Sequence, residues 1–171
     1  MVLSYLHNRD NWEFALKDGV DDLNINIPGR FEQYRLDDTT TVILDGAHNT
    51  QKVSALIGRL KTISMDKFDV IFEAKQGKDI QTMLRLLLPV TRRLYVVEFY
   101  ESQDTTSKAE RADHIITIAK KLGFDQVKYL PTDKIKTVNS GSNILVTGSF
   151  MHLKTVRDAL SFRTNATASK Y

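Results

Sequence analysis

The sequence predicts a three-layer α/β domain in which a mostly parallel sheet of five or six strands is flanked by helices. Short β-branched runs that are apolar throughout alternate with segments of helical periodicity. Strands apolar on both faces are buried on both faces, and helical connections between them give parallel neighbours with right-handed crossovers. A chain of 171 residues is long enough for one such domain with its own core.

Each strand and helix follows from its local pattern. Short apolar runs predict strands at 41–44, 69–72, 94–99, 127–130 and 144–147. Apolar residues at helical spacing predict helices at 51–60, 79–88, 108–122 and 152–160. Gly123 closes the third helix, and the strand at 127–130 has the weakest pattern. This order of elements is typical of a Rossmann-like arrangement.

The segments outside this alternation predict the domain boundaries. Residues 1–27 have apolar side chains at rough helical spacing but no strand on which to pack, and Pro28-Gly29 marks a turn. We interpret 1–27 as the remnant of a preceding domain and linker, and 28–162 as the folded domain. Residues 163–171 are polar and without pattern, which predicts a flexible tail.

Composition narrows the class of protein. The absence of cysteine excludes disulfides and thiolate chemistry, and agrees with a reducing cytoplasm. No apolar run is long enough to span a bilayer and no signal-peptide pattern is present, so we expect no membrane contact. The net charge of +3 is small and the densest basic pair, Arg92-Arg93, stands alone before a strand, which argues against nucleic-acid binding. The four histidines lack the spacing of a zinc site, and we predict no metal ligands.

Polar residues follow the strand at 41–44, where ligands bind in an open parallel sheet. In the run 45–50 (D-G-A-H-N-T), the small second and third residues permit a tight turn, so Asp45 and His48 can point into one crevice. Asn49 or the following threonine can cap the next helix, whose free N–H groups favour an anion. A structural alternative remains open, in which Asp45 and Asn49 only close the turn and His48 donates to a backbone carbonyl.

A second polar run, Thr147-Gly148-Ser149, follows the strand at 144–147 and precedes a helix. Its hydroxyl groups and backbone amides suit a carboxylate or phosphate. The alternative is that Ser149 simply caps the helix. No segment matches a P-loop, and no glycine-rich dinucleotide motif follows a strand.

The run 42–49 (V-I-L-D-G-A-H-N) resembles the signature that opens the C-terminal domain of folylpolyglutamate synthases and bifunctional dihydrofolate synthases, and more distantly that of the Mur ligases. Further segments resemble this family in the same order: 28–32 (P-G-R-F-E), 77–79 (G-K-D) and 146–150 (V-T-G-S-F). The family usually has proline where Thr50 stands, which concerns the start of the helix more than the chemistry.

The resemblance implies a cytoplasmic, monomeric, ATP-dependent ligase that joins L-glutamate to the γ-carboxyl of a folate through an acyl phosphate. The family's P-loop and magnesium ligands lie in a preceding ATPase domain, of which 1–27 would be the remnant. Most contacts to ATP and Mg²⁺ are therefore expected outside this sequence, and this chain alone is expected to be inactive.

The resemblance also implies roles for individual residues. The nucleotide would be contacted by Arg30, Asp45, His48 and Asn49. His48 would lie near the phosphates as a catalytic residue that stabilises developing charge. Thr147 and Ser149 would bind the incoming glutamate.

Other functions remain open from the sequence. The chain could be a stand-alone domain that binds a nucleotide or anion, or one that works with an ATPase partner in trans. It could belong to a Mur-type ligase of peptidoglycan precursors. It could also be a structural Rossmann-like domain in which neither polar run binds a ligand.

Overall fold

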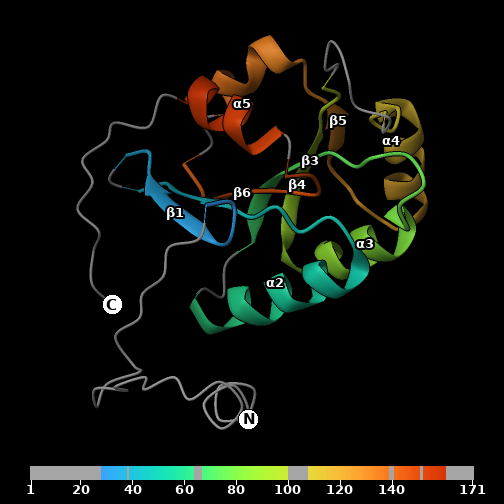
Figure 1. Cartoon of the computed structure of the whole chain (residues 1–171), viewed down its shortest axis with the longest axis horizontal. Coiled ribbons are helices and arrows are strands. Elements are labelled where there is room, and N and C mark those ends of the chain that lie inside the picture. Colours follow the sequence, from blue (N-terminus) through green and yellow to red (C-terminus); the bar gives the residue numbers. More distant parts are fainter. Residues whose placement is uncertain are drawn as a thin grey trace, which may run out of the picture.

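The computed structural model describes residues 28–37, 39–63, 67–99, 108–138, 141–150 and 152–160. The predictions for 1–27 and 163–171 lie outside this part of the chain. The described residues form one six-stranded sheet in the order β1-β2-β6-β3-β4-β5 with helices on both faces (Figure 1). All strand pairs are parallel except β1 with β2. The predicted fold class is therefore confirmed.

The strands are β1 (Glu32–Arg35), β2 (Thr41–Leu44), β3 (Phe68–Phe72), β4 (Thr91–Val96), β5 (Val127–Tyr129) and β6 (Ile144–Thr147). The helices are α2 (Thr50–Ile63), α3 (Ile80–Leu87), α4 (Ala112–Lys121) and α5 (His152–Leu160). Two short 3₁₀ helices, η2 (Leu88–Val90) and η3 (Thr132–Thr137), complete the described elements.

The core has one layer on each face of the sheet, because successive strand residues point to opposite faces. Val70 of β3 packs with the apolar sides of α2, α3 and α4. Its neighbour Ile71 packs on the other face with residues of η3 and α5. Figure 1 shows the same division, with α2 and α3 below the sheet and α5 above it.

The structure corrects three expectations about the elements. β1 was not predicted; it is an antiparallel edge strand whose Glu32 pairs with Leu44. β4 begins at Thr91, so the interpretation that Arg92-Arg93 precedes a strand is wrong. α4 begins at Ala112, later than predicted, because the preceding segment is extended and Ala109 bridges to Lys75.

The position of β6 between β2 and β3 creates a topological switch point in the sheet. The chain leaves β2 towards α2 on one face of the sheet, and leaves β6 towards α5 on the other face (Figure 1). Connections that diverge in this way leave a crevice beyond the carboxyl ends of neighbouring strands. The amide of Gly148 donates to the carbonyl of Ala47 at 3.0 Å across this point. Both polar runs predicted from the sequence therefore lie side by side.

Candidate functional site

Arg30 lies at the tip of a turn with unusual backbone geometry. Gly29 before it has φ of 74° and Phe31 after it has φ of 51°. A left-handed conformation is strained for a bulky residue such as phenylalanine and persists only where the surroundings hold it. Here the Phe31 amide donates to Asp45 Oδ2 at 3.0 Å. The Arg30 side chain is half-buried and makes no hydrogen bond or ion pair with the rest of the described chain, so it is available to a ligand.

Asp45 links this turn to the one after β2. Its Oδ1 accepts from the Ala47 amide at 2.8 Å while Oδ2 accepts from Phe31. The side chain is only 8% exposed, and burial raises the pKa of its carboxyl above 3.8, against the hydrogen bonds from Phe31 and Ala47 and the charge of Arg30, which act to lower it. The geometry matches the structural alternative for Asp45, and the predicted nucleotide contact remains a prediction.

Replacing Asp45 with asparagine should change how stability depends on pH. The raised pKa means that the folded protein holds this proton more tightly than the unfolded chain does. Between pH 3.8 and the raised value, the contribution of Asp45 to the free energy of unfolding therefore falls as pH rises. Urea unfolding at a series of pH values gives the free energy of unfolding of the wild type and of Asp45→Asn. The wild-type value minus the variant value should decrease through this pH window and then become constant. Carboxyl groups whose pKa is lowered, such as that of Asp37, contribute equally to the stability of both proteins, so their contributions cancel in this difference. A difference that rises with pH would contradict the expectation.

His48 and Asn49 begin the connection from β2 to α2. His48 Nδ1 lies 2.8 Å from the Gly46 carbonyl oxygen, and Nε2 lies 3.2 Å from Lys52 Nζ. Asn49 Oδ1 accepts from the Lys52 amide at 2.9 Å and so caps α2. Thr50 is the first helical residue, so α2 begins one residue earlier than predicted. Lys52 was missed by the sequence interpretation, although its spacing of four from His48 on a helix was the signal that could have revealed it.

The run after β6 is tightly enclosed. Thr147 and Ser149 are buried, and Thr147 Oγ1 donates to the Ala47 carbonyl at 3.4 Å. Phe150 is 48% exposed, and its ring occupies the space where any side chain at Gly29 or Gly46 would project. The structure thus places the predicted glutamate residues beside the predicted nucleotide residues, without testing either role.

A buried acid–histidine pair joins the ends of β3 and α5. Glu73 Oε2 lies 2.6 Å from His152 Nδ1, and both side chains are almost fully buried. The Phe99 ring stacks on the imidazole at a centroid distance of 5.3 Å. His152 Nε2 is buried and has no hydrogen-bond partner among the described residues. No local sequence pattern signals this pair, because its members are far apart in the chain.

A second buried contact supports the Arg30 turn from α5. Arg157 Nη2 donates to both carboxylate oxygens of Glu32 at 2.7 Å. Glu32 also accepts from the Gly29 amide and the Tyr34 hydroxyl. The turn is therefore fixed from two sides, by Asp45 and by Glu32.

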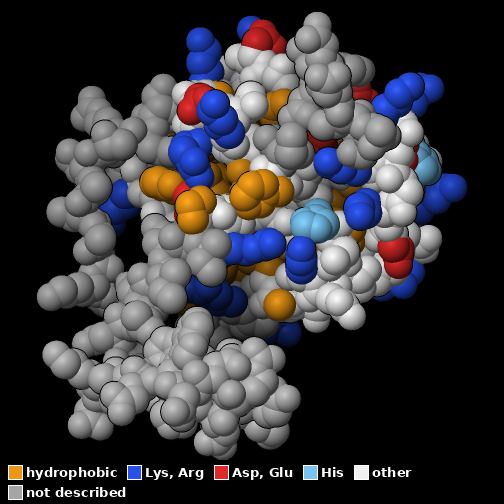
Figure 2. Space-filling model, in the orientation of Figure 1, with side chains coloured by type: hydrophobic (Ala, Val, Ile, Leu, Met, Phe, Trp, Pro, Cys, Tyr) orange, Lys and Arg blue, Asp and Glu red, His pale blue; other side chains and the backbone are white. Residues whose placement is uncertain are grey.

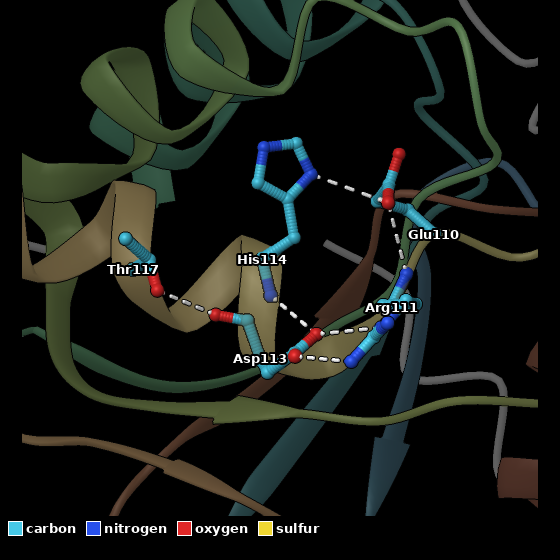
Figure 3. Close-up of a pocket in the computed structure, with 5 residues that line it drawn as sticks. All are labelled: Glu110, Arg111, Asp113, His114 and Thr117. Carbon is cyan, nitrogen blue, oxygen red and sulfur yellow. Dashed lines mark hydrogen bonds and ion pairs between the residues drawn. The ribbon is translucent and has the colours of Figure 1, made fainter.

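A surface hollow of about 430 Å³ beside α4 is separate from this site (Figure 3). Its side chains pair with one another: Arg111 Nε lies 3.0 Å from Asp113 Oδ1, and His114 Nδ1 lies 3.2 Å from Glu110 Oε1. Arg111 and Asp113 are largely exposed, and exposed pairs contribute little. We assign no function to this hollow.

Basic side chains are prominent on one face of the molecule. Figure 2 shows Lys and Arg side chains with a histidine around a group of hydrophobic ones. The turn before β1 contains Arg30, the run after β2 contains His48, and the first turn of α2 contains Lys52; all three are half-buried. Such a surface favours an anionic ligand.

The described residues lack two features, a membrane-spanning helix and a cluster of metal ligands. None of the helices in the described part is both long and apolar enough to cross a membrane. Within the same ranges, no three histidine or acidic side chains come together in a way that could hold a metal ion.

The chain is an α/β domain with an open, mostly parallel sheet and two linked polar loops at its switch point, which is where ligands bind in sheets of this kind. The family model described as "Mur ligase, glutamate ligase domain" matches residues 29–150. The chain belongs to this family, which confirms the resemblance seen in the sequence. A search of curated proteins finds no match.

Solved structures of folylpolyglutamate synthases share this fold. The Helicobacter pylori enzyme matches with a TM-score of 0.68 and 22% identity, over 92% of this chain and 37% of the other. The Mycobacterium tuberculosis enzyme complexed with ADP and AMPPCP matches with a TM-score of 0.62 and 23% identity, over 81% and 33%. A bifunctional folylpolyglutamate/dihydrofolate synthase with Mn, AMPPNP and L-glutamate bound matches with a TM-score of 0.60 and 19% identity, over 78% and 32%. The chain thus spans about a third of the length of these proteins.

Proposed function

We propose that this chain is the glutamate-ligase domain of a folylpolyglutamate synthase-like enzyme, acting with an ATPase domain in the cytoplasm. The observation that carries the proposal is the direct contact between the two polar runs, made by the Gly148 amide and the Ala47 carbonyl. We propose that this contact sets a nucleotide subsite beside an amino-acid subsite. Structures of the same fold contain ADP and AMPPCP, or AMPPNP with L-glutamate. On this proposal the domain comprises 28–162, with 1–27 derived from a preceding domain and linker.

The proposed reaction has two steps. The γ-phosphoryl group of ATP passes to a carboxylate oxygen of the folate tail, which gives an acyl phosphate and ADP. The glutamate amine then attacks the acyl carbon, an amide bond forms, and phosphate leaves. Positioning and charge neutralisation dominate such catalysis, and two facing subsites can provide both.

The residues present fit these subsites. Among the described residues, the Arg30 guanidinium has no hydrogen-bond or ion-pair partner, and its planar donors suit phosphate oxygens. We propose that Asp45 and Asn49, which accept hydrogen bonds from the Phe31 and Lys52 amides, form the nucleotide subsite together with His48. We propose that Thr147 and Ser149 receive the glutamate, and that Mg²⁺ is held chiefly by the ATPase domain.

The test combines this chain with the ATPase portion of a related synthase that lacks its own C-terminal third. We expect ATP-dependent ligation of glutamate to a folate from the combination, and no turnover from either part alone, because domain closure assembles the site. Ser149→Ala should raise the glutamate KM about tenfold, the worth of one lost hydrogen bond to a charged group, and leave the ATP KM unchanged.

Ser54→Ala is the matched control, since Ser54 is exposed on α2. Turnover by this chain alone would contradict the proposal. Ligation of a different amino acid in place of glutamate would assign the chain to another branch of the family.

A further inference from the structure

The contact between His48 and Lys52 determines which of the two carries positive charge. A lysine ammonium has hydrogens to donate and no lone pair, so His48 Nε2 accepts across the 3.2 Å contact. The hydrogen of the neutral ring then lies on Nδ1, which donates to the Gly46 carbonyl at 2.8 Å. Both ring nitrogens are thus used in one tautomer. His48 is uncharged in this arrangement, and the ammonium of Lys52 is the cation.

The other polar groups around this pair leave the ammonium as the group available to a ligand. Asp45 uses its two carboxylate oxygens for backbone amides, and Asn49 caps α2. The first turn of α2 contains no acidic residue that could neutralise Lys52. A lysine ammonium has three hydrogens, so it can keep its bond to His48 and still donate to an anion.

We propose that Lys52 is an anion-binding residue of this site, which contacts phosphate oxygens of the nucleotide, and that His48 is its positioning residue. This inference rests on the proposed function. It reverses the part expected of His48, because the fixed positive charge belongs to Lys52. A phosphate ligand is favoured over an amino-acid carboxylate, since Lys52 follows β2 on the side of the Arg30 turn whereas Thr147 and Ser149 follow β6. Two cations, Arg30 and Lys52, also match the multiple charge of a diphosphate better than a single carboxylate.

The first test is the tautomer of His48 in the full chain, read from the ¹⁵N shifts of both ring nitrogens at neutral pH. We expect the form with hydrogen on Nδ1. In Lys52→Met, the Nε2 signal should move because its donor is gone. A ring with hydrogen on Nε2 only, or a charged ring, would overturn the inference.

The second test follows backbone amide shifts of the full chain during titration with inorganic pyrophosphate, and separately with L-glutamate. Pyrophosphate should shift the first turn of α2, and Lys52→Met should weaken this binding about tenfold. Lys61→Met is the matched control, because Lys61 is an exposed lysine in the last turn of the same helix. The affinity of this variant for pyrophosphate should equal that of the wild type.

Three results of the titration would overturn the proposal: no pyrophosphate shift at this turn, equal affinities for wild type and Lys52→Met, or an equal loss in Lys61→Met. A response of this turn to glutamate in place of pyrophosphate would overturn it as well. The proposed function can fail while this inference stands. That outcome would be pyrophosphate binding that depends on Lys52, together with no glutamate ligation when the chain is combined with the ATPase portion of a related synthase.

Discussion

Alanine in place of Gly148 is expected to lower the free energy of unfolding by about 4 kcal/mol, from overpacking and backbone strain together. Gly148 has φ of 106°, which a residue with a side chain rarely adopts. A Cβ atom here would overlap the carbonyl oxygen of Glu73 and press on the Phe72 ring. The nearest obstacle is the backbone of Glu73, directly after the central strand β3, so it cannot rotate away as a side chain could. Urea unfolding followed by far-UV circular dichroism measures the change.

Two other glycines separate the causes of this loss. Gly123→Ala has a similar positive φ of 91° but open space around the new methyl group, so it should cost only the backbone strain, about 1–2 kcal/mol. Gly58→Ala in the middle of α2 also meets open space, and should stabilise the protein by about 0.5–1 kcal/mol. A loss at Gly148 no greater than that at Gly123 would show that the approach of β6 to β3 is looser than described.

Asp69→Ala is expected to lower the free energy of unfolding by about 3 kcal/mol, since it removes the acidic partner of a buried ionic cluster. Asp69 lies in β3 beside Arg93 of β4 and is fully buried. Its Oδ1 accepts from Arg92 and Arg93 at 3.0 Å, and its Oδ2 accepts from Arg93 at 2.6 Å. Both arginines are about a third exposed (40% and 32%), so water partly replaces the lost contacts and the cost stays at the lower end for a broken buried pair. Urea unfolding at neutral pH gives the value.

Asp113→Ala is the matched control for this variant. Asp113 also pairs with an arginine, but both side chains are well exposed. Because water screens such a pair, the control should leave the free energy of unfolding almost unchanged. Equal losses in the two variants would mean that burial does not determine the strength of these ion pairs.

The local patterns in the sequence were sufficient for the buried strands and their helices. β2 and β6 have the predicted bounds, because each is a short β-branched run buried on both faces. The pattern failed at β4, where Arg92 and Arg93 lie inside a strand. Their charge is compensated by Asp69, which is distant in sequence, so no local rule could assign them to a strand. The edge strand β1 was missed for a related reason: it mixes buried and exposed residues, and only pairing with β2 orders it.

Part of the candidate site also followed from the sequence. Glycine and small residues after two strands predicted tight turns, and the order of strands and helices placed both turns at one edge of a parallel sheet. That reasoning predicted Asp45, His48 and Ser149 as candidates, and the structure places them in the two neighbouring runs. The pairs Lys52–His48 and Glu73–His152 were not, although the first lies within one turn of helix and needed only the correct start of α2.

The sequence by itself determined the alternation of strands and helices, the two polar runs and the family to which they belong, because each depends on neighbouring residues. The tertiary structure decided how those residues are used. It inserted β6 between β2 and β3, which brings Gly148 against Ala47 across a hundred residues of chain. It also brought the Asp45 carboxylate to the strained turn at Arg30 and placed Lys52 Nζ 3.2 Å from His48 Nε2. Hydrogen bonds and burial depend on groups that meet only after folding, and a linear pattern contains no record of those distances.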